Sequence, residues 1–478
     1  MRADVVASGG PLRLDAAARN RLGERIGHAS ALARRERRPI IASVSSRLEP
    51  ELDLAAAVLA ARRAADGFFC FEQPDRDGFA LAALGQAASV EASGTGRFAQ
   101  VAGGCRRLGR GALADETSSP AAGPVWVGGF AFADEGAAAP EWSSLPPARL
   151  TLPEICLARH GTAAWLTATV MVQGDEAPGA LFDRIEGRLA ELHRARMPLL
   201  DPDPVEQARV AGAAPPEHFE SAVARAVERI AAGEVEKVVL AREVRVHMAR
   251  PAEPGAIYDA LRGAFPSCYC YLVGTPEAAF VGASPELLVR REGQRAQTVA
   301  LAGTRRRSAD PSVDRHLAEQ LLQSPKDREE QAIVARRIER ALRPVSVWVA
   351  AADEPVVVKV QNVQHLGTPI RAQLSEPVAC VELAGLLHPT PAVGGEPREG
   401  ALRLIPALEG LDRGWYAGPV GWTDLSEDGE FCVALRCALL RGTVAHLYAG
   451  EGIVRDSVPS EELEANEAKL QALLPLLA

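Results

Sequence analysis

The segment Val235-Glu-Lys-Val-Val-Leu-Ala-Arg242 carries a lysine at the start of an apolar run that predicts a β-strand over residues 237–246. Lys237 is one of only four lysines among the 53 basic residues of the chain. An arginine cannot give up its proton in a protein, whereas the pKa of a lysine can be lowered until it does. Lys237 is therefore a candidate for proton transfer, although a lysine can also persist by chance.

Acidic pairs at helical spacing occur twice in the second half of the chain. Asp327 and Glu330 lie in a helix predicted over residues 325–342, and Glu461 and Glu464 lie in the last predicted helix. Spacing of i, i+3 puts two carboxylates on one helix face. Oxygen ligands without histidine or cysteine suit Mg²⁺, but such pairs taken alone are more often a solvated surface.

Several short segments complete a specific set. They are Glu-Lys-Val-Val-Leu-Ala-Arg (236–242), Ser-Pro-Glu-Leu-Leu (284–288), Leu-Ala-Gly-Thr-Arg (301–305), Val-Gln-His-Leu (363–366), His-Pro-Thr-Pro-Ala-Val-Gly-Gly (388–395) and Gly-Glu-Gly-Ile-Val (450–454). In this order they resemble the chorismate-utilising enzymes, and among these most closely the isochorismate synthases. Upstream, residues 68–74, residues 128–132 and the strand predicted around Trp165 look like the N-terminal part of longer members.

The resemblance implies a single large α+β unit, in which two antiparallel β-sheets pack face to face with helices outside, in α/β/β/α layers. Residues 1–210 would form the N-terminal part of this body without an activity of their own, and residues 211–478 the catalytic region that binds chorismate. Proline-rich stretches at 201–204 and 213–216 bracket a linker. The residue pattern predicts strands at 68–72, 125–132 and 164–170, and helices at 52–65 and 180–197.

The resemblance assigns acid–base roles to two residues. Lys237 matches the lysine that activates water for attack at C2 of chorismate, and Glu286 matches the general acid that protonates the departing C4 hydroxyl. This chemistry needs a neutral lysine and a carboxylic acid with a raised pKa. Relatives that use ammonia, such as anthranilate synthase, typically carry glutamine at the lysine position and work with a glutaminase. We therefore expect water as the nucleophile and no glutaminase subunit.

Substrate-binding residues also follow from the resemblance. Tyr416 and Arg436 match positions that hold the enolpyruvyl carboxylate, a group that a guanidinium fork suits. Lys469 matches a lysine near the ring carboxylate and the metal. The other matches surround the ring pocket, and they are Gly303, Thr304, His365, Ala392 and the backbone at Gly452. Both His365 and His388 have an alternative interpretation as hydrogen-bonded residues of the core.

The metal site that the resemblance implies is altered in this chain. Glu330 matches the first Mg²⁺ ligand, but the last-helix glutamate four residues before the lysine is replaced by Ala465. Glu462 matches the glutamate three residues earlier. A one-residue shift in helix register would bring Glu464 to the metal, with a rotation of about 100°. We expect Mg²⁺ to be bound by Glu330 together with Glu462 or Glu464.

Two further positions depart from the family pattern. The usual Gly-Ala-Gly is Gly450-Glu451-Gly452 here, which adds a carboxylate at the edge of the pocket, and the usual histidine after Glu330 is Gln331.

Three functions compete for this sequence. The leading one is an Mg²⁺-dependent isochorismate synthase, an isomerase that most simply serves menaquinone biosynthesis. The others are a salicylate synthase or siderophore-pathway enzyme, and a protein of this fold that binds chorismate with impaired catalysis.

Composition narrows the remaining possibilities. A net charge of −9 argues against a nucleic-acid partner, and no run approaches the ~18 apolar residues that span a membrane. The N-terminus lacks the apolar core of a signal peptide, and the eight cysteines are scattered. Reduced thiols and a cytoplasmic location are the corresponding expectations.

Overall fold

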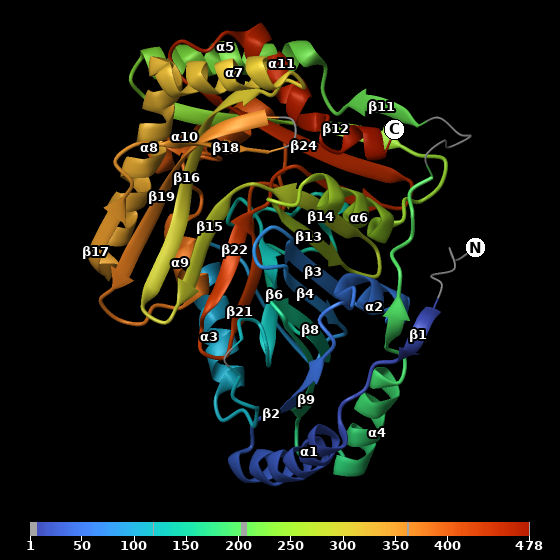
Figure 1. Ribbon diagram of the computed structural model, residues 1–478. Helices are drawn as coiled ribbons and strands as arrows, with labels where there is room; N and C mark the ends of the chain where they lie inside the picture. The colour runs from blue at the N-terminus through green and yellow to red at the C-terminus, as the bar shows by residue number, and fades with distance from the viewer. Residues whose placement is uncertain (1–6, 118, 202–207, 361–362, 478) are drawn as a thin grey trace.

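The computed structural model describes residues 7–117, 119–201, 208–360 and 363–477. Two large antiparallel sheets pack face to face at its centre (Figure 1). The first sheet has 12 strands. One of them, β20 (Gly395–Glu396), pairs with β12 and is not part of the linear strand order. The other strands are, in spatial order, β11 (Arg209–Gly212), β12 (Lys237–His247), β24 (Val444–Ile453), β23 (Cys437–Arg441), β14 (Ala279–Ser284), β13 (Tyr269–Gly274), β3 (Phe68–Gln73), β4 (Phe79–Leu84), β8 (Ile155–His160), β9 (Ala163–Val172) and β2 (Ile40–Leu48).

The second sheet has ten strands. One of them, β18 (Val356–Lys359), pairs with β19 and is not part of the linear strand order. The spatial order of the others is β17 (Ser346–Ala351), β19 (Val363–Leu374), β16 (Arg295–Arg306), β15 (Leu287–Glu292), β22 (Gly429–Val433), β21 (Pro419–Asp424), β6 (Val125–Phe130), β7 (Ala148–Leu152) and β5 (Ala88–Ala92). A separate ribbon joins β1 (Ala7–Pro11) to β10 (His193–Ala195).

Helices cover the outer faces of both sheets. The helices are α1 (Ala16–Glu36), α2 (Leu54–Ala61), α3 (Arg97–Gly109), α4 (Pro178–Leu189), α5 (Pro216–Ala231), α6 (Pro254–Ala264), α7 (Pro311–Gln323), α8 (Pro325–Leu342), α9 (Cys380–Leu387), α10 (Arg398–Glu409) and α11 (Pro459–Leu470). Helices α1, α2, α4 and α6 pack on the 12-stranded sheet, and α3, α8 and α9 pack on the ten-stranded sheet. Among the described residues, no helix is both long and apolar enough to cross a membrane.

Strand β3 shows why the sheets stack. Side chains alternate along a strand, so Phe69 and Phe71 belong to the core between the sheets, while Phe68 and Cys70 belong to the core under the helices. A strand buried on both faces reads as a nearly continuous apolar run, and residues 68–71 of this strand are all apolar, followed by the buried Glu72. Between the sheets, Phe79 of β4 stacks on Trp422 of β21 with ring centroids 6.1 Å apart. The predicted layered α+β fold is confirmed.

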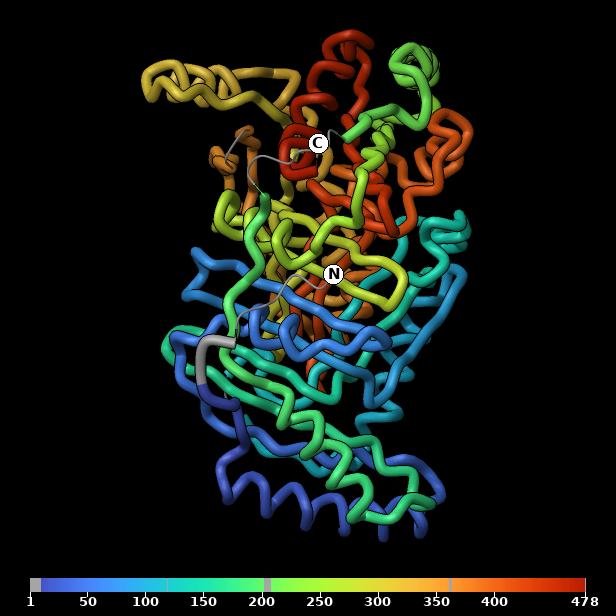
Figure 2. The backbone as a smooth tube through the Cα atoms, turned by 90° about the vertical axis from the view of Figure 1, so that its right-hand side faces the viewer, coloured from blue at the N-terminus to red at the C-terminus, as the bar shows by residue number. Residues whose placement is uncertain are grey.

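Both sheets are continuous across the two halves of the chain. In the 12-stranded sheet β3 pairs with β13, and in the ten-stranded sheet β6 pairs with β21. Figure 2 shows the first 200 residues (blue to green) mainly in the lower part, joined to the later residues above. The predicted boundary at 210/211 falls inside β11, which pairs with β12, so it does not separate two bodies. Within the predicted linker, residues 202–207 lie outside the described residues, and residues 209–212 form β11.

The helix predicted at 180–197 is shorter than expected. Helix α4 ends at Leu189, and β10 then pairs with β1. The helix pattern overestimated its length because the strand partner that ends it is remote in sequence. By contrast, α8 occupies 325–342 as predicted, since the Ser324 hydroxyl accepts the Asp327 backbone N–H at its start.

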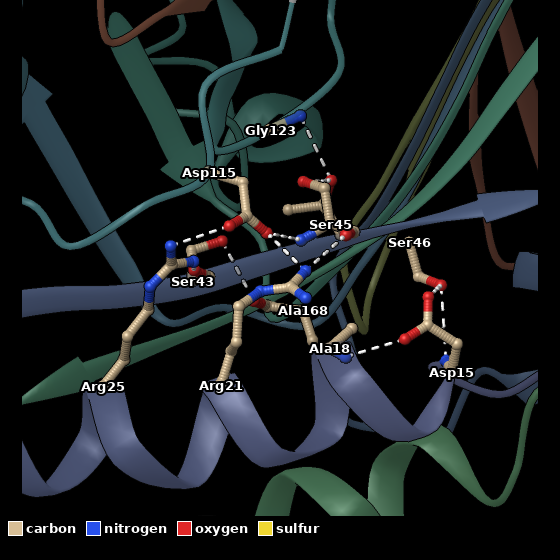
Figure 3. A network of polar contacts seen from close by, with 11 residues as sticks. Asp15, Ala18, Arg21, Arg25, Ser43, Ser45, Ser46, Asp115, Gly123 and Ala168 are labelled. Carbon is tan, nitrogen blue, oxygen red and sulfur yellow. Dashed lines mark hydrogen bonds and ion pairs between the residues drawn. The ribbon is translucent and has the colours of Figure 1, made fainter.

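Polar contacts fix α1 against the sheet (Figure 3). The Asp15 carboxylate caps the helix by accepting the Ala18 N–H at 2.7 Å. Arg21 and Arg25 both form ion pairs with Asp115, at 3.2 Å and 2.7 Å. Asp115 in turn accepts the backbone N–H of Ser45 in β2. The outer helix is thus joined to β2 by charge-assisted contacts as well as by apolar packing.

Candidate active site

A cavity lies between the end of the 12-stranded sheet and the ten-stranded sheet, beside α8 and α11. Most of the residues predicted from the sequence line it. These are Glu286, Gly303, Thr304, Glu330, His365, Ala392, Tyr416, Arg436, Gly452, Glu462 and Lys469. They come from β16, β19, β24, α8, α11 and four loops, so the fold gathers segments that are far apart in the chain.

Lys237 is the first residue of β12, and its side chain is 1% exposed. Its Nζ lies 2.8 Å from Oε1 of Glu330 in α8. Gly452 of β24 lies against this pair, because a Cβ there would be 2.6 Å from Glu330 Oε1 and 2.8 Å from Lys237 Cε. A side chain at Gly452 would therefore displace Lys237 or Glu330 from its present position. An ammonium in an ion pair has no free lone pair, so Lys237 can act as a base only after its proton passes to another group.

Glu286 sits in the turn between β14 and β15, where Val433 N–H donates to its backbone carbonyl. The Thr390 hydroxyl donates to its Oε1 at 3.4 Å. Burial raises the pKa of the Glu286 carboxyl to about 7, against the opposing effect of the Lys237 charge. The predicted raised pKa of the acid is therefore present. Thr390 was not singled out from the sequence, although it lies in the His-Pro-Thr-Pro-Ala segment.

His365, Thr304 and Arg436 form one hydrogen-bonded group. His365 Nδ1 lies 3.2 Å from the Gly303 carbonyl and 3.0 Å from the Thr304 hydroxyl. Because a carbonyl only accepts, Nδ1 carries the proton, and Nε2 accepts from Arg436 Nη2 at 3.2 Å. Burial, with the charges of Arg436 and Lys469, holds the pKa of His365 well below its usual range. A neutral imidazole thus orients the guanidinium in the cavity.

Helix α11 presents Glu462 and Ala465 to the cavity. Glu462 is 8% exposed, and its Oε1 lies 3.4 Å from Lys326 Nζ. Glu464 is exposed on another side of the helix, so the shifted register that would bring it to the metal is not formed. Residues three apart share a helix face, whereas adjacent residues differ by about 100°. The position expected for Glu464 is therefore wrong, and Glu462 keeps its place as a candidate ligand.

Glu451 and Lys469 form a buried ion pair at the same cavity. Lys469 Nζ donates to Glu451 Oε2 and to the Gly450 carbonyl, at 2.7 Å in each case. Burial raises the pKa of Glu451 to about 7, while the Lys469 charge opposes this shift. The carboxylate noted as a departure from the family pattern is thus part of the site.

Two further positions named from the sequence, His388 and Gln331, are not part of the cavity lining. His388 Nε2 lies 2.9 Å from the Phe132 carbonyl, and burial lowers the pKa of this histidine to about 3. It belongs to the core, as its alternative interpretation stated. The Gln331 amide donates to the Thr368 hydroxyl at 2.6 Å and points away from the cavity lining. Asp327, in contrast, lines the cavity together with Glu330, the residue with which it forms the acidic pair noted in the sequence.

A separate acidic cluster is formed by Glu141, Glu243 and His446, whose ligand atoms lie within 4.8 Å of one another. The Glu243 carboxylate already accepts from Arg245 Nε and from His446 Nδ1, at 2.7 Å each. Its charge is thus compensated by the protein, and we assign no metal to it.

Comparison with known proteins places this cavity in a family context. The chain matches the sequence model of the family described as chorismate binding enzyme over residues 27–478. The chain belongs to this family. It is 36% identical over 457 residues to the salicylate biosynthesis isochorismate synthase of Pseudomonas aeruginosa, covering 95% of this chain and 92% of the relative.

Other members of the chorismate-binding family agree with this assignment. The isochorismate synthase MenF of Bacillus subtilis is 34% identical over 75% of each chain. The solved structure of the menaquinone-specific isochorismate synthase from Escherichia coli has a TM-score of 0.78 and 26% identity, covering 95% of this chain and all of that one. The family resemblance inferred from the motifs is therefore confirmed. The relatives named isochorismate synthases are enzymes of the isomerase type.

Proposed function

We propose that this protein is an isochorismate synthase, an isomerase that converts chorismate to isochorismate. The observation that carries the proposal is the buried Glu286 carboxyl in the cavity, whose pKa burial raises to about 7. The Lys237 charge acts on this carboxyl, and Lys237 is paired with Glu330, which lines the same cavity. The full-length similarity of the chain to proteins named isochorismate synthases supports the same activity. A lysine rather than a glutamine at position 237 favours water over ammonia as the nucleophile.

The reaction can be written on these residues. Once its own proton has passed to solvent, neutral Lys237 accepts a proton as the oxygen of water bonds to C2 of chorismate. The ring double bonds shift, the C4–O bond breaks, and Glu286 donates its proton to the departing hydroxyl, which leaves as water. One water is consumed and one is released, so the net change is an isomerisation. General acid and base groups of this kind typically contribute about 10²–10⁴ in rate each.

Substrate orientation falls to cationic and backbone groups around the cavity. Arg436, held by His365, would bind the enolpyruvyl carboxylate with its free guanidinium N–H groups. Tyr416 is fixed by stacking on Tyr448, with ring centroids 5.4 Å apart. Lys469 would reach the ring carboxylate, and the ring would lie over Gly303, Thr304 and Ala392.

We include Mg²⁺ as the cofactor. The cavity is lined by the carboxylates of Glu286, Asp327, Glu330, Glu451 and Glu462, against the cations Lys326, Arg436 and Lys469. This excess of oxygen ligands, without cysteine, fits a hard divalent cation. Glu330 and Glu462 would hold the ion. When bound, it would supply positive charge for the substrate carboxylate, as Mg²⁺ commonly does with anionic ligands.

Product analysis tests the proposal. The purified protein is incubated with chorismate and Mg²⁺, and the products are separated. Isochorismate is expected. Salicylate with pyruvate would instead identify a salicylate synthase, and unchanged chorismate would identify a binding protein without turnover. The names of the relatives include both menaquinone and salicylate roles. The menaquinone role, the cytoplasmic location and the independence from a glutaminase stay predictions.

A further inference from the structure

One departure from the family pattern removes a carboxylate and another adds one, and both lie at the same cavity. Ala465 of α11 and Glu451 of β24 both line it, and α11 packs on β24. The family pattern has a glutamate at the first position and an alanine at the second. In this chain the carboxylate is missing from the helix and present on the neighbouring strand. The cavity keeps the same number of carboxylates at these two positions.

The Glu451 carboxylate is satisfied on one side only. Its Oε2 accepts from Lys469 Nζ at 2.7 Å. Its Oε1 is buried and has no hydrogen-bond partner among the residues that the structure describes, and the residue is 4% exposed. A buried carboxylate oxygen without a donor costs free energy, so buried polar atoms nearly always have a partner. The orphaned oxygen belongs to a cavity-lining residue, where a bound cation would complete its coordination.

A second carboxylate is close to it. Glu462 is one of the charges that act on Glu451, and both side chains line the cavity. Two neighbouring carboxylates repel each other unless a cation lies with them. Lys469 is already held by Glu451 and the Gly450 carbonyl, and Lys326 approaches Glu462 only to 3.4 Å. Neither lysine therefore contacts Oε1 of Glu451, and this oxygen is left for a cation.

We propose that Glu451 is the metal ligand that takes the place of the side chain missing at Ala465, a proposal that rests on the isochorismate synthase function above. Lys469 holds Oε2 and thereby orients the carboxylate, so that Oε1 is left for Mg²⁺. The ligand set of this protein is then Glu330, Glu462 and Glu451. The carboxylate has moved from α11 to β24, and the site does not lack one.

Direct metal binding tests the exchange without relying on turnover. Mn²⁺ is the probe, and free Mn²⁺ is measured by electron paramagnetic resonance in substrate-free protein, with Mg²⁺ as competitor. Glu451→Gln keeps the size of the side chain and is expected to weaken Mn²⁺ binding by about tenfold or more. The matched control is Glu464→Gln, which removes an exposed glutamate from α11 and should leave the affinity unchanged. Thermal melting verifies that each variant is folded.

A double variant tests whether positions 451 and 465 exchange one ligand. Glu451→Ala should lose affinity, and adding Ala465→Glu should restore it to within about threefold of the parent. Ala465→Glu alone, which removes nothing, should tighten binding. Parental affinity in Glu451→Gln, no recovery in the double variant, or no Mn²⁺ binding by the parent would each overturn the proposal. Failure of the proposed function is distinct, because it appears as an absence of isochorismate whatever the affinities.

Discussion

Lys237 is the buried side chain to which we assign the base of the reaction. We predict that Lys237→Ala and Lys237→Gln lower the turnover of chorismate by about 10²–10⁴, because neither variant has a base to take the proton from water. The glutamine variant keeps an N–H donor for Glu330, so its fold should be preserved. Isochorismate formation gives the rate, and equilibrium chorismate binding should change little. Lys359→Gln is the control, since its partly exposed amine is paired with Asp314. Near-parental turnover in Lys237→Gln would remove the lysine from the mechanism.

Glu286 should set the alkaline limit of activity. A general acid must be protonated, and burial raises the pKa of this carboxyl to about 7. We therefore predict that kcat/KM falls with rising pH above about 7, approaching tenfold per pH unit, and that Glu286→Gln loses nearly all activity. A pH–rate profile of the parent measures this limit. The Thr390 hydroxyl donates a hydrogen bond that lowers the pKa of Glu286, so Thr390→Val should move the alkaline limit to higher pH. An alkaline limit that stays fixed in Thr390→Val would argue for another acid.

The resemblance carried by the motifs was enough to predict most of the side chains that line the cavity, Glu286 and Arg436 among them. The predicted base, Lys237, is not among the lining residues and instead contacts Glu330. Their pairings were not predictable. Lys237 with Glu330, and Lys469 with Glu451, are contacts between separate elements that the linear order does not contain. The error at Glu464 has the same origin. Which side of α11 faces the cavity depends on the packing of the helix against β24.

At the scale of elements, the bulge in β16 shapes the substrate side of the cavity. The register between β16 and β19 shifts between Ala302 and Thr304, which brings Thr304 opposite His365. Gly303 makes the bulge possible with φ of +71°, and a Cβ there would lie 3.1 Å from Asp327 Cβ. The bulge therefore couples the strand to the start of α8.

We predict that Gly303→Ala destabilises the protein by about 1–3 kcal/mol and lowers activity, because it combines an unfavourable φ with contact to α8. Gly293→Ala is the matched control. Its φ is +60°, but a Cβ there would meet nothing within 4 Å. It should lose only about 1 kcal/mol and keep full activity. Denaturant unfolding and chorismate turnover measure the two effects. Equal activity in both variants would show that the bulge does not position Thr304 and His365.

Local signals and long-range pairing contributed differently to the elements. The beginning of α8 was predictable because Ser324 and Pro325 form a cap and a first turn that act locally. The end of α4 was not, since it depends on the pairing of β10 with β1. The same holds for the whole molecule. Individual strands such as β3 and β9 were predictable from their apolar pattern, but the pairing of β3 with β13 joins residues that no local pattern relates.

At the scale of the whole molecule, sheets that are continuous through both halves should make unfolding a single cooperative event, so a buried titrating group affects total stability. Glu286 has an ordinary pKa of 4.5 when unfolded and about 7 in the fold. The folded state therefore favours the protonated form. Its contribution to stability is complete below pH 4.5 and is lost as pH rises through 7, a difference of about 3 kcal/mol in unfolding free energy.

This linkage predicts the behaviour of a variant that cannot ionise. Glu286→Gln should be about 2 kcal/mol more stable relative to the parent at pH 8 than at pH 5, because only the parent must ionise a buried carboxyl. Denaturant unfolding at both pH values measures the difference, and the comparison between proteins cancels the other titrating groups. Glu319→Gln, at an exposed position of α7, should show no such dependence. If Glu286→Gln gained nothing at pH 8, the carboxyl would already be ionised at low cost in the fold. It could then not hold the proton that the departing hydroxyl requires, and both the stability argument and the assignment of Glu286 as general acid would fail together.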